Sequence, residues 1–360
     1  MARKHPNKQA KPIHSSDASG APQIPHSEPA GGTGSLEAAM ERESNPVKRF
    51  LKILGPGLIT GASDDDPSGI GTYAMAGASL GFATLWTAVL TFPMMAAVQY
   101  CCAKVGMVSG TGLASVLRGH YSRKLLYPVI VGLVIANTIN AGTDIGAIAA
   151  GINLLVPIPI AALIVPIAVT IVVIQILGSY RLIARIFKWL TLMLFAYIIS
   201  TFLAKPHWGE VFRATFVPTA RFDTTYLLMI VAILGTTISP YLFFWQASQE
   251  VEEEISMGRK RLWQREGATD AELKYAAWDV SIGMIFCNVV FYFGILGTAA
   301  TLHVAGKTDI QSATDAAQAL RPLAGNAATI LFALGIIGAG FLAVPVLTGS
   351  AAYAIAEALG

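Results

Sequence analysis

Charged residues are scarce in this sequence. Asp, Glu, Lys and Arg together make up 13% of its 360 residues, whereas they make up about one-quarter of an average soluble protein. Much of the charge is confined to residues 1–52, 118–124 and 251–274. The sequence between these stretches contains apolar runs long enough to cross a bilayer, which takes about 20 residues of helix. This pattern argues against a soluble globular protein and predicts a polytopic membrane protein.

The sequence also contains few cysteines and has a small net positive charge. Only Cys101, Cys102 and Cys287 are present, in apolar surroundings and without the spacing of metal ligands, which excludes a small secreted domain held by disulfides. The formal net charge is only +3 and does not gather on one face, which argues against nucleic-acid binding.

The first 47 residues lack the apolar core of a signal peptide. They are rich in Pro, Ser, Gly and Ala without an apolar period, so we expect a disordered cytoplasmic tail. Residues 48–360 are expected to form one transmembrane domain. It contains eight predicted spans: 51–80, 82–105, 125–154, 159–178, 188–204, 225–254, 274–303 and 326–358.

The distribution of Lys and Arg predicts the orientation of these spans. With the N-terminus in the cytoplasm, 20 of the 25 basic residues lie on the cytoplasmic side and 5 on the other. Basic residues are enriched in cytoplasmic loops. We therefore expect a multi-pass protein of the cell (inner) membrane, embedded in the lipid bilayer, with its N-terminus inside.

The first predicted span is interrupted by three acidic residues. Asp64, Asp65 and Asp66 are followed by Pro67 in the middle of an otherwise apolar segment. Carboxylates are costly in lipid, so they are expected to face protein or water and to be functional. Proline removes a backbone N–H and interrupts the helix. Because 51–63 and 70–80 are each too short to cross alone, the sequence predicts a broken helix.

The sixth span contains the counterpart of this interruption. Pro240 again interrupts an apolar run, and Thr236, Thr237 and Ser239 precede it. Backbone carbonyls freed at such a break need partners, and a cation can supply one. Breaks in spans one and six are typical of a five-plus-five inverted repeat with its binding site near the membrane midplane.

Two further groups of polar residues each share one face of a predicted helix. In span three, Asn137, Asn140 and Asp144 lie on one face, which could line a pathway or form interhelical hydrogen bonds. For Asp144 the pathway is favoured because the side chain is ionisable. In the second half of span six, Gln246, Gln249 and Glu250 also share a face, whereas residues 252–254, all Glu, are expected at a solvated helix end.

Several motifs resemble those of a known family. Gly55-Pro56-Gly57 followed by Asp66-Pro67-Ser68-Gly69 is similar to the first helix of the Nramp divalent-metal transporters, whose hallmark is Asp-Pro-Gly-Asn. Thr236–Gln246, Thr143-Asp144 and Leu331–Leu359 resemble their sixth, third and eighth helices. The resemblance implies an all-α transmembrane bundle of the LeuT type. The family has two repeats of five helices, whereas this sequence contains eight predicted spans. We therefore expect a chain truncated after helix 8, without spans nine and ten and with an incomplete second repeat.

The departures from the family pattern carry information about the substrate. Gly69 replaces the Asn of the hallmark, and Ser239 replaces a Met that provides a thioether in the family. Tyr241 and Gln246 replace two histidines of the sixth helix, and Ala147 replaces a Glu of the third helix. This set resembles the Nramp-related magnesium transporters and argues against proton coupling. Carboxylates, carbonyls and water suit hard cations, whereas thioethers select softer metals, and Mg²⁺ usually retains several waters.

The predicted function is transport of a divalent cation, most of all Mg²⁺ and also Mn²⁺, as a partly hydrated ion. The metal is the substrate, no cofactor is expected, and the protein is expected to be a monomer. Asp66 is the first candidate ligand, and the predicted metal site also contains Asp65, Thr236, Thr237, Ser239 and Gly69. The predicted pathway contains Asp64, Asp144, Asn137, Asn140, Tyr241, Gln246, Gln249 and Glu250.

Three other functions are compatible with parts of the sequence. A proton-coupled Mn²⁺/Fe²⁺ Nramp importer is disfavoured by Ser239 and Ala147. A membrane-embedded, Mg²⁺-dependent prenyltransferase would need two separate Asp-rich motifs, and the sequence has one. A sodium-coupled amino-acid transporter would share the fold, but three consecutive carboxylates suit a cation better than a carboxylate substrate. We therefore expect a transporter and not an enzyme.

Overall fold

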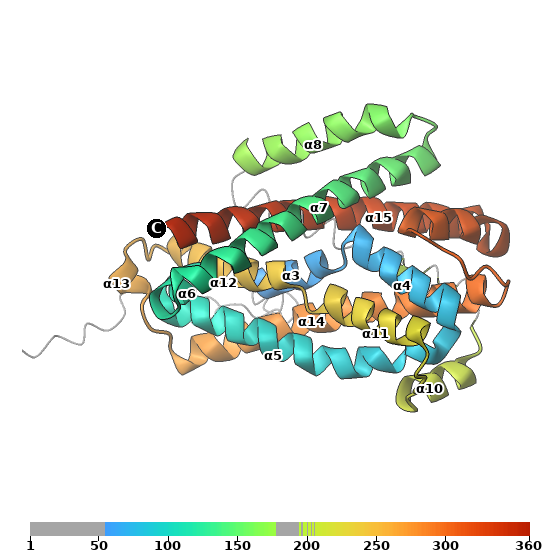
Figure 1. Ribbon diagram of the computed structural model, residues 1–360, viewed down its shortest axis with the longest axis horizontal. Coiled ribbons are helices and arrows are strands. Elements are labelled where there is room, and N and C mark those ends of the chain that lie inside the picture. Colours follow the sequence, from blue (N-terminus) through green and yellow to red (C-terminus); the bar gives the residue numbers. More distant parts are fainter. Residues whose placement is uncertain (1–54, 178–193, 196, 200, 203, 205) are drawn as a thin grey trace, which may run out of the picture.

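The structure, a computed structural model, describes residues 55–177 and 194–360 except for 196, 200, 203 and 205. The predicted N-terminal tail and much of the predicted fifth span lie outside the described residues. All regular secondary structure in the described part of the chain is helical (Figure 1).

The first span is a broken helix, as predicted. Helix α3 (Pro56–Asp64) ends at the acidic run, and α4 (Pro67–Leu80) begins directly after it. Asp66 is the residue before the first turn of α4, and its side chain accepts a hydrogen bond from the backbone N–H of Gly69. Asp66-Pro67 is thus a helix start, with a capping carboxylate and a proline in the first turn.

The sixth span is broken in the same way. Helix α11 (Thr224–Thr237) ends before Ile238, and α12 (Pro240–Ser256) begins with Pro240. Together they form one candidate membrane crossing. The prediction of paired breaks in spans one and six is confirmed.

The remaining elements surround these two broken helices. They are α5 (Trp86–Ser109), α6 (Leu113–His120), α7 (Arg123–Leu155), α8 (Ile160–Leu177), α10 (Trp208–Phe216), α13 (Leu262–Arg265), α14 (Asp270–Thr298) and α15 (Ala313–Leu359), with a short 3₁₀ helix η1 (Gly81–Thr84) and a short π-helix η2 (Ala299–His303). In the described residues, six helical segments are long and apolar enough to cross a membrane, and they match the predicted spans two, three, four, six, seven and eight.

Helix α15 begins earlier than predicted. It starts at Ala313 and not near residue 326. The side-chain oxygen of Ser312 accepts a hydrogen bond from the backbone N–H of Asp315 at 3.1 Å, which satisfies one of the N–H groups that have no partner at a helix start.

Glycines bring the first broken helix into close contact with α14. A Cβ atom at Gly61 would lie 2.1 Å from the backbone oxygen of Gly283, and one at Gly57 would lie 2.6 Å from the backbone nitrogen of Val280. Only glycine permits this approach, which is typical of small residues between membrane helices. Asp279 on α14 fixes the start of α3, because its carboxylate accepts hydrogen bonds from the N–H groups of Gly55 and Gly57.

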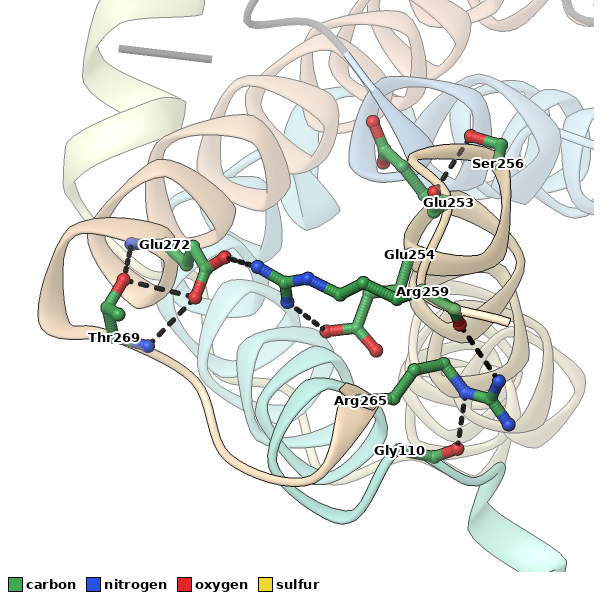
Figure 2. A network of polar contacts seen from close by, with 8 residues as sticks. All are labelled: Gly110, Glu253, Glu254, Ser256, Arg259, Arg265, Thr269 and Glu272. Carbon is green, nitrogen blue, oxygen red and sulfur yellow. Dashed lines mark hydrogen bonds and ion pairs between the residues drawn. The ribbon is translucent and has the colours of Figure 1, made fainter. Parts of the chain in front are cut away.

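An ion-pair network joins the end of α12 to the start of α14 (Figure 2). The guanidinium of Arg259 contacts Glu254 at 3.1 Å and also Glu272. The prediction that Glu254 lies at a solvated helix end is wrong, because only 4% of this residue is exposed. The chain turns at Gly258, which has a φ of 99°, and this turn carries Arg259 back toward Glu254.

The loop after α12 is also anchored to α5. The guanidinium of Arg265 donates to the backbone oxygens of Gly110 and Arg259 (Figure 2). It also donates to the backbone oxygen of Lys260. Gly110 is the residue that ends α5. The end of α5, the end of α12 and the start of α14 are therefore held together by polar contacts, of which the one between Arg259 and Glu254 is buried.

Candidate metal-binding site

The two breaks meet at one cavity of about 680 Å³. Asp66 at the first break and Ser239 at the second both line it, and α7 forms another wall. Six of the predicted site residues line this cavity: Asp66, Thr236, Ser239, Asn137, Asn140 and Tyr241. Residues more than 70 positions apart in the chain are thus brought together, as the paired breaks predict.

Asp66 is the carboxylate of this cavity, and only 2% of it is exposed. Its Oδ1 accepts a hydrogen bond from the N–H of Gly69, and its Oδ2 accepts one from Nδ2 of Asn140 at 2.7 Å. The hydroxyl of Ser68 lies 3.0 Å from Asp66 Oδ1 and 2.8 Å from Asn140 Oδ1, and its single proton can be donated to either. A carboxylate has about four lone-pair positions, so Asp66 can cap α4 and still coordinate a cation.

Gly69 lies between the two broken helices. A Cβ atom at this position would be 2.9 Å from Asp66 Oδ1 and 2.9 Å from Thr236 Oγ1. The absence of a side chain therefore leaves room between a carboxylate oxygen of one break and a hydroxyl oxygen of the other. Any larger residue would crowd both oxygens.

At the second break, the predicted residues divide between the cavity and the helix interior. Ser239 Oγ donates to the backbone oxygen of Thr236 at 2.8 Å, and both residues line the cavity. Thr237 is not among the residues that line it, and its hydroxyl donates to the backbone oxygen of Ile233 within α11. Tyr241, which follows Pro240, donates its hydroxyl proton to the backbone oxygen of Ser63 in α3 at 2.9 Å.

The first two acids of the run face away from the cavity. Oδ2 of Asp64 and Oδ1 of Asp65 lie 3.0 Å and 3.7 Å from Sγ of Cys287 on α14, and neither residue lines the cavity. The prediction placed Asp65 beside Asp66 as a ligand, and the structure does not bring it there. The contact with Cys287 has no signal in the sequence, since a single cysteine in an apolar helix usually serves in packing.

The polar face of α7 has mixed roles. Nδ2 of Asn137 donates to the backbone oxygen of Leu347 on α15 at 3.0 Å, which is an interhelical hydrogen bond. Asp144 accepts a hydrogen bond from the N–H of Ser68 at 3.3 Å but does not line the cavity.

The polar residues of α12 form a separate buried group. Nε2 of Gln246 donates to Glu250 at 2.7 Å, and Gln249 is also buried. None of the three lines the cavity around Asp66.

Several carboxylate oxygens near the first break have no donor. Among the described residues, Oδ1 of Asp64, Oδ2 of Asp65 and Oδ2 of Asp144 are buried without a hydrogen-bond partner. Unpaired buried charge is costly, and cations compensate it. No three His, Cys, Asp or Glu side chains converge to hold a metal ion in the part of the chain that the structure describes. A cation here would therefore need no more than two carboxylates, completed by hydroxyl, carbonyl or water oxygens.

Comparison with known proteins identifies the family. A model of the Nramp family, described as natural resistance-associated macrophage protein-like, matches residues 57–360. The chain belongs to the Nramp family. With six candidate crossings in its described residues, this Nramp chain is a multi-pass membrane protein.

Individual relatives agree with this assignment. The divalent metal cation transporter MntH of Brucella suis biovar 1 is 26% identical over 310 residues, which are 84% of this chain and 66% of that protein. The manganese transporter of Eremococcus coleocola, solved with an aromatic bis-isothiourea compound, matches with a TM-score of 0.66 at 18% identity over 88% of this chain and 67% of that one. A mutant of the same transporter matches with a TM-score of 0.64 over 88% and 70% of the two chains.

The matches cover part of each relative and support the predicted fold. The chain spans about two thirds of the length of the relatives it matches. The structural likeness confirms the predicted fold, a bundle of the LeuT type with broken first and sixth helices. The relatives are named as transporters and not as enzymes.

Proposed function

We propose that this protein moves divalent metal cations across the membrane by alternating access, with a partly hydrated ion held between the two breaks. The observation that carries this proposal is the shared cavity, where Asp66 of one broken helix meets Thr236 and Ser239 of the other. Broken helices that meet near the midplane hold substrates and ions in transporters with inverted repeats. The names of the relatives support a metal as the cargo.

The chemistry of the cavity supports a hard cation. Its described polar lining residues offer a carboxylate, amides and hydroxyls, with no thioether, thiol or imidazole among them: Asp66, Asn137, Asn140, Ser68, Thr72, Thr236, Ser239 and Tyr241. Oxygen ligands suit Mg²⁺ and Mn²⁺. The cavity of about 680 Å³ has room for retained water, which takes about 30 Å³ per molecule in the liquid.

The proposed cargo is therefore Mg²⁺, with Mn²⁺ also accepted. The oxygen-only lining and the room for water favour Mg²⁺, which dehydrates reluctantly. The relatives named for manganese favour a manganese importer as the second candidate. Obligatory proton coupling is not proposed, since Tyr241, Gln246 and Ala147 replace ionisable residues that a proton relay would use.

The proposal includes the placement of the protein. The excess of Lys and Arg on one side supports an N-terminus in the cytoplasm. The proposed location is the inner membrane, and the proposed assembly state is a monomer. A prenyltransferase is not supported, because Asp66 is the one carboxylate among the described residues that line the cavity.

Uptake into proteoliposomes tests this function. The full chain is reconstituted, and entry of Mg²⁺, Mn²⁺ and Cd²⁺ is measured while the internal pH is recorded. We expect uptake of Mg²⁺ and Mn²⁺ without stoichiometric acidification, and loss of uptake in Asp66→Asn. The matched control is Asp309→Asn, because Asp309 is an exposed acid outside the cavity. A wild-type chain that admits none of these ions would refute the proposal, and Mn²⁺ uptake coupled to protons would support the second candidate.

A further inference from the structure

Each of the two breaks contains a backbone carbonyl that lacks the N–H donor it would have in an uninterrupted helix. In an α-helix the carbonyl of residue i accepts a hydrogen bond from the N–H of residue i+4. For Ser63 that residue is Pro67, and for Thr236 it is Pro240. Proline has no N–H, so these two carbonyls need other partners wherever they are buried.

Each of these carbonyls receives a hydroxyl proton. At the second break the donor is local, because Ser239 belongs to the same broken helix as Thr236. At the first break the donor comes from the other broken helix, since Tyr241 in α12 donates to Ser63 in α3 across 2.9 Å. Tyr241 is therefore a direct polar link between the two breaks.

Tyr241 is itself held in place. Ser350 on α15 donates its hydroxyl proton to the backbone oxygen of Tyr241 at 2.7 Å. Tyr241 is 5% exposed and lines the cavity that contains Asp66, and Ser350 is fully buried. The phenol ring is thus fixed between the cavity and the freed carbonyl of α3.

We propose that Tyr241 is a positioning residue that lowers the affinity of the site for its cation by holding the Ser63 carbonyl. This inference rests on the proposed function. A carbonyl freed at a helix break can be satisfied by a hydroxyl or by a cation. While Tyr241 donates to Ser63, a cation that approaches this carbonyl competes with the phenol proton. A weaker affinity favours release, which transport needs as much as it needs binding.

Removal of the hydroxyl should therefore tighten binding. In Tyr241→Phe the Ser63 carbonyl is left buried without a donor, and a cation becomes its favourable partner. A net hydrogen bond is worth about as much as a three- to tenfold change in an equilibrium constant, so the Kd for Mn²⁺ should fall by about that factor. Because release slows, the KM for uptake and the turnover should both decrease.

Isothermal titration of Mn²⁺ into the full chain in detergent, together with uptake kinetics, measures these effects. The matched control is Tyr226→Phe. Tyr226 is also buried and its hydroxyl also donates to a backbone oxygen, that of Thr219, but it does not line the cavity. We expect Tyr226→Phe to lower the melting temperature without changing the Kd. A purely structural role for Tyr241 would give the same result as this control.

Two results would overturn the inference. An unchanged Kd in Tyr241→Phe would mean that the hydrogen bond to Ser63 persists with the cation bound, and a higher Kd would mean that the phenol oxygen is itself a ligand. If Tyr241→Phe does not fold, Ser350→Ala tests the same inference, because it loosens the backbone of Tyr241 and should lower the Kd by a smaller factor. Wild-type protein that binds no divalent cation would refute the proposed function, whereas normal wild-type binding with unaltered variants would refute only the role of Tyr241.

Discussion

The side chain of Asn140 donates a hydrogen bond to the carboxylate of Asp66 at 2.7 Å. This contact joins α7 to the break in the first span, so the orientation of the proposed ligand depends on a helix other than its own. A ligand held by a fixed donor binds with less loss of conformational freedom. The site is thus built from three parts: a carboxylate at one break, hydroxyls at the other, and an amide that aims the carboxylate.

The first prediction concerns this amide. Asn140→Leu keeps the approximate size of the side chain but removes the donor to Asp66. Without this donor the carboxylate of Asp66 must be ordered when the ion binds, which costs about 0.5–1.5 kcal/mol for one side chain, so we expect the Kd for Mn²⁺ to rise by about two- to tenfold. Titration calorimetry on the full chain measures the change.

Asn137→Leu is the control for this variant. Asn137 lies on the same face of α7, but its amide donates to the backbone oxygen of Leu347 and not to Asp66. We expect it to lower the melting temperature with a smaller effect on affinity. Equal affinity losses in the two variants would contradict a specific role of Asn140.

The second prediction concerns the space at Gly69. Gly69→Ala places a methyl group 2.9 Å from oxygens of Asp66 and Thr236, so we expect cation uptake to fall steeply. Helix propensity favours alanine over glycine by about 1 kcal/mol, so the loss of uptake should not come with a comparable loss of helix stability. Gly146→Ala in α7 is the control, because a Cβ there meets nothing within 4 Å. Normal uptake in Gly69→Ala would show that the ion does not pass between the two breaks.

The breaks themselves could be predicted from the sequence because their signals are local. Pro67 and Pro240 each interrupt an apolar run, and the loss of one N–H acts within a single helical turn. The cavity-lining role of Asp66, Thr236 and Ser239 follows from the same local geometry once the two breaks are brought together.

The direction in which Asp64 and Asp65 point could not be predicted. It depends on the close packing of α3 on α14, where Gly61 meets Gly283 across a long distance in the sequence. The same packing sets Cys287 beside the two acids. The sequence left an interhelical hydrogen bond of Asn137 open as one interpretation, but it could not name Leu347 as the partner, because any residue carries such a carbonyl.

The third prediction concerns the ion pairs of Arg259. Arg259→Met leaves the buried Glu254 and the partly buried Glu272 without their cation. Removing one partner of a buried ion pair costs about 3–5 kcal/mol, so we expect a marked fall in the melting temperature of the purified chain. Adding Glu254→Gln should restore part of the loss, because it removes one of the uncompensated charges. Arg261→Met, at an exposed position of the same loop, should leave the melting temperature unchanged, and a similar value for Arg259→Met would contradict the prediction.

The last prediction concerns selectivity at the second break. Ser239 lines the cavity next to Thr236, and we propose that its oxygen is a hard ligand or a partner for water held by the ion. In Ser239→Met a thioether replaces this oxygen, and thioethers favour soft metals. We expect tighter Cd²⁺ binding and weaker Mg²⁺ uptake, measured by calorimetry and in proteoliposomes.

Ser239→Leu separates coordination from crowding. Leucine fills about the same space as methionine but has no sulfur, so it should weaken Mg²⁺ uptake without tightening Cd²⁺ binding. If both variants shift the preference between Cd²⁺ and Mg²⁺ equally, selectivity depends on the width of the cavity, and Gly69 becomes its main determinant. If only the methionine variant gains Cd²⁺ affinity, the side chain at position 239 contacts the ion, because sulfur acts on a metal only through direct coordination.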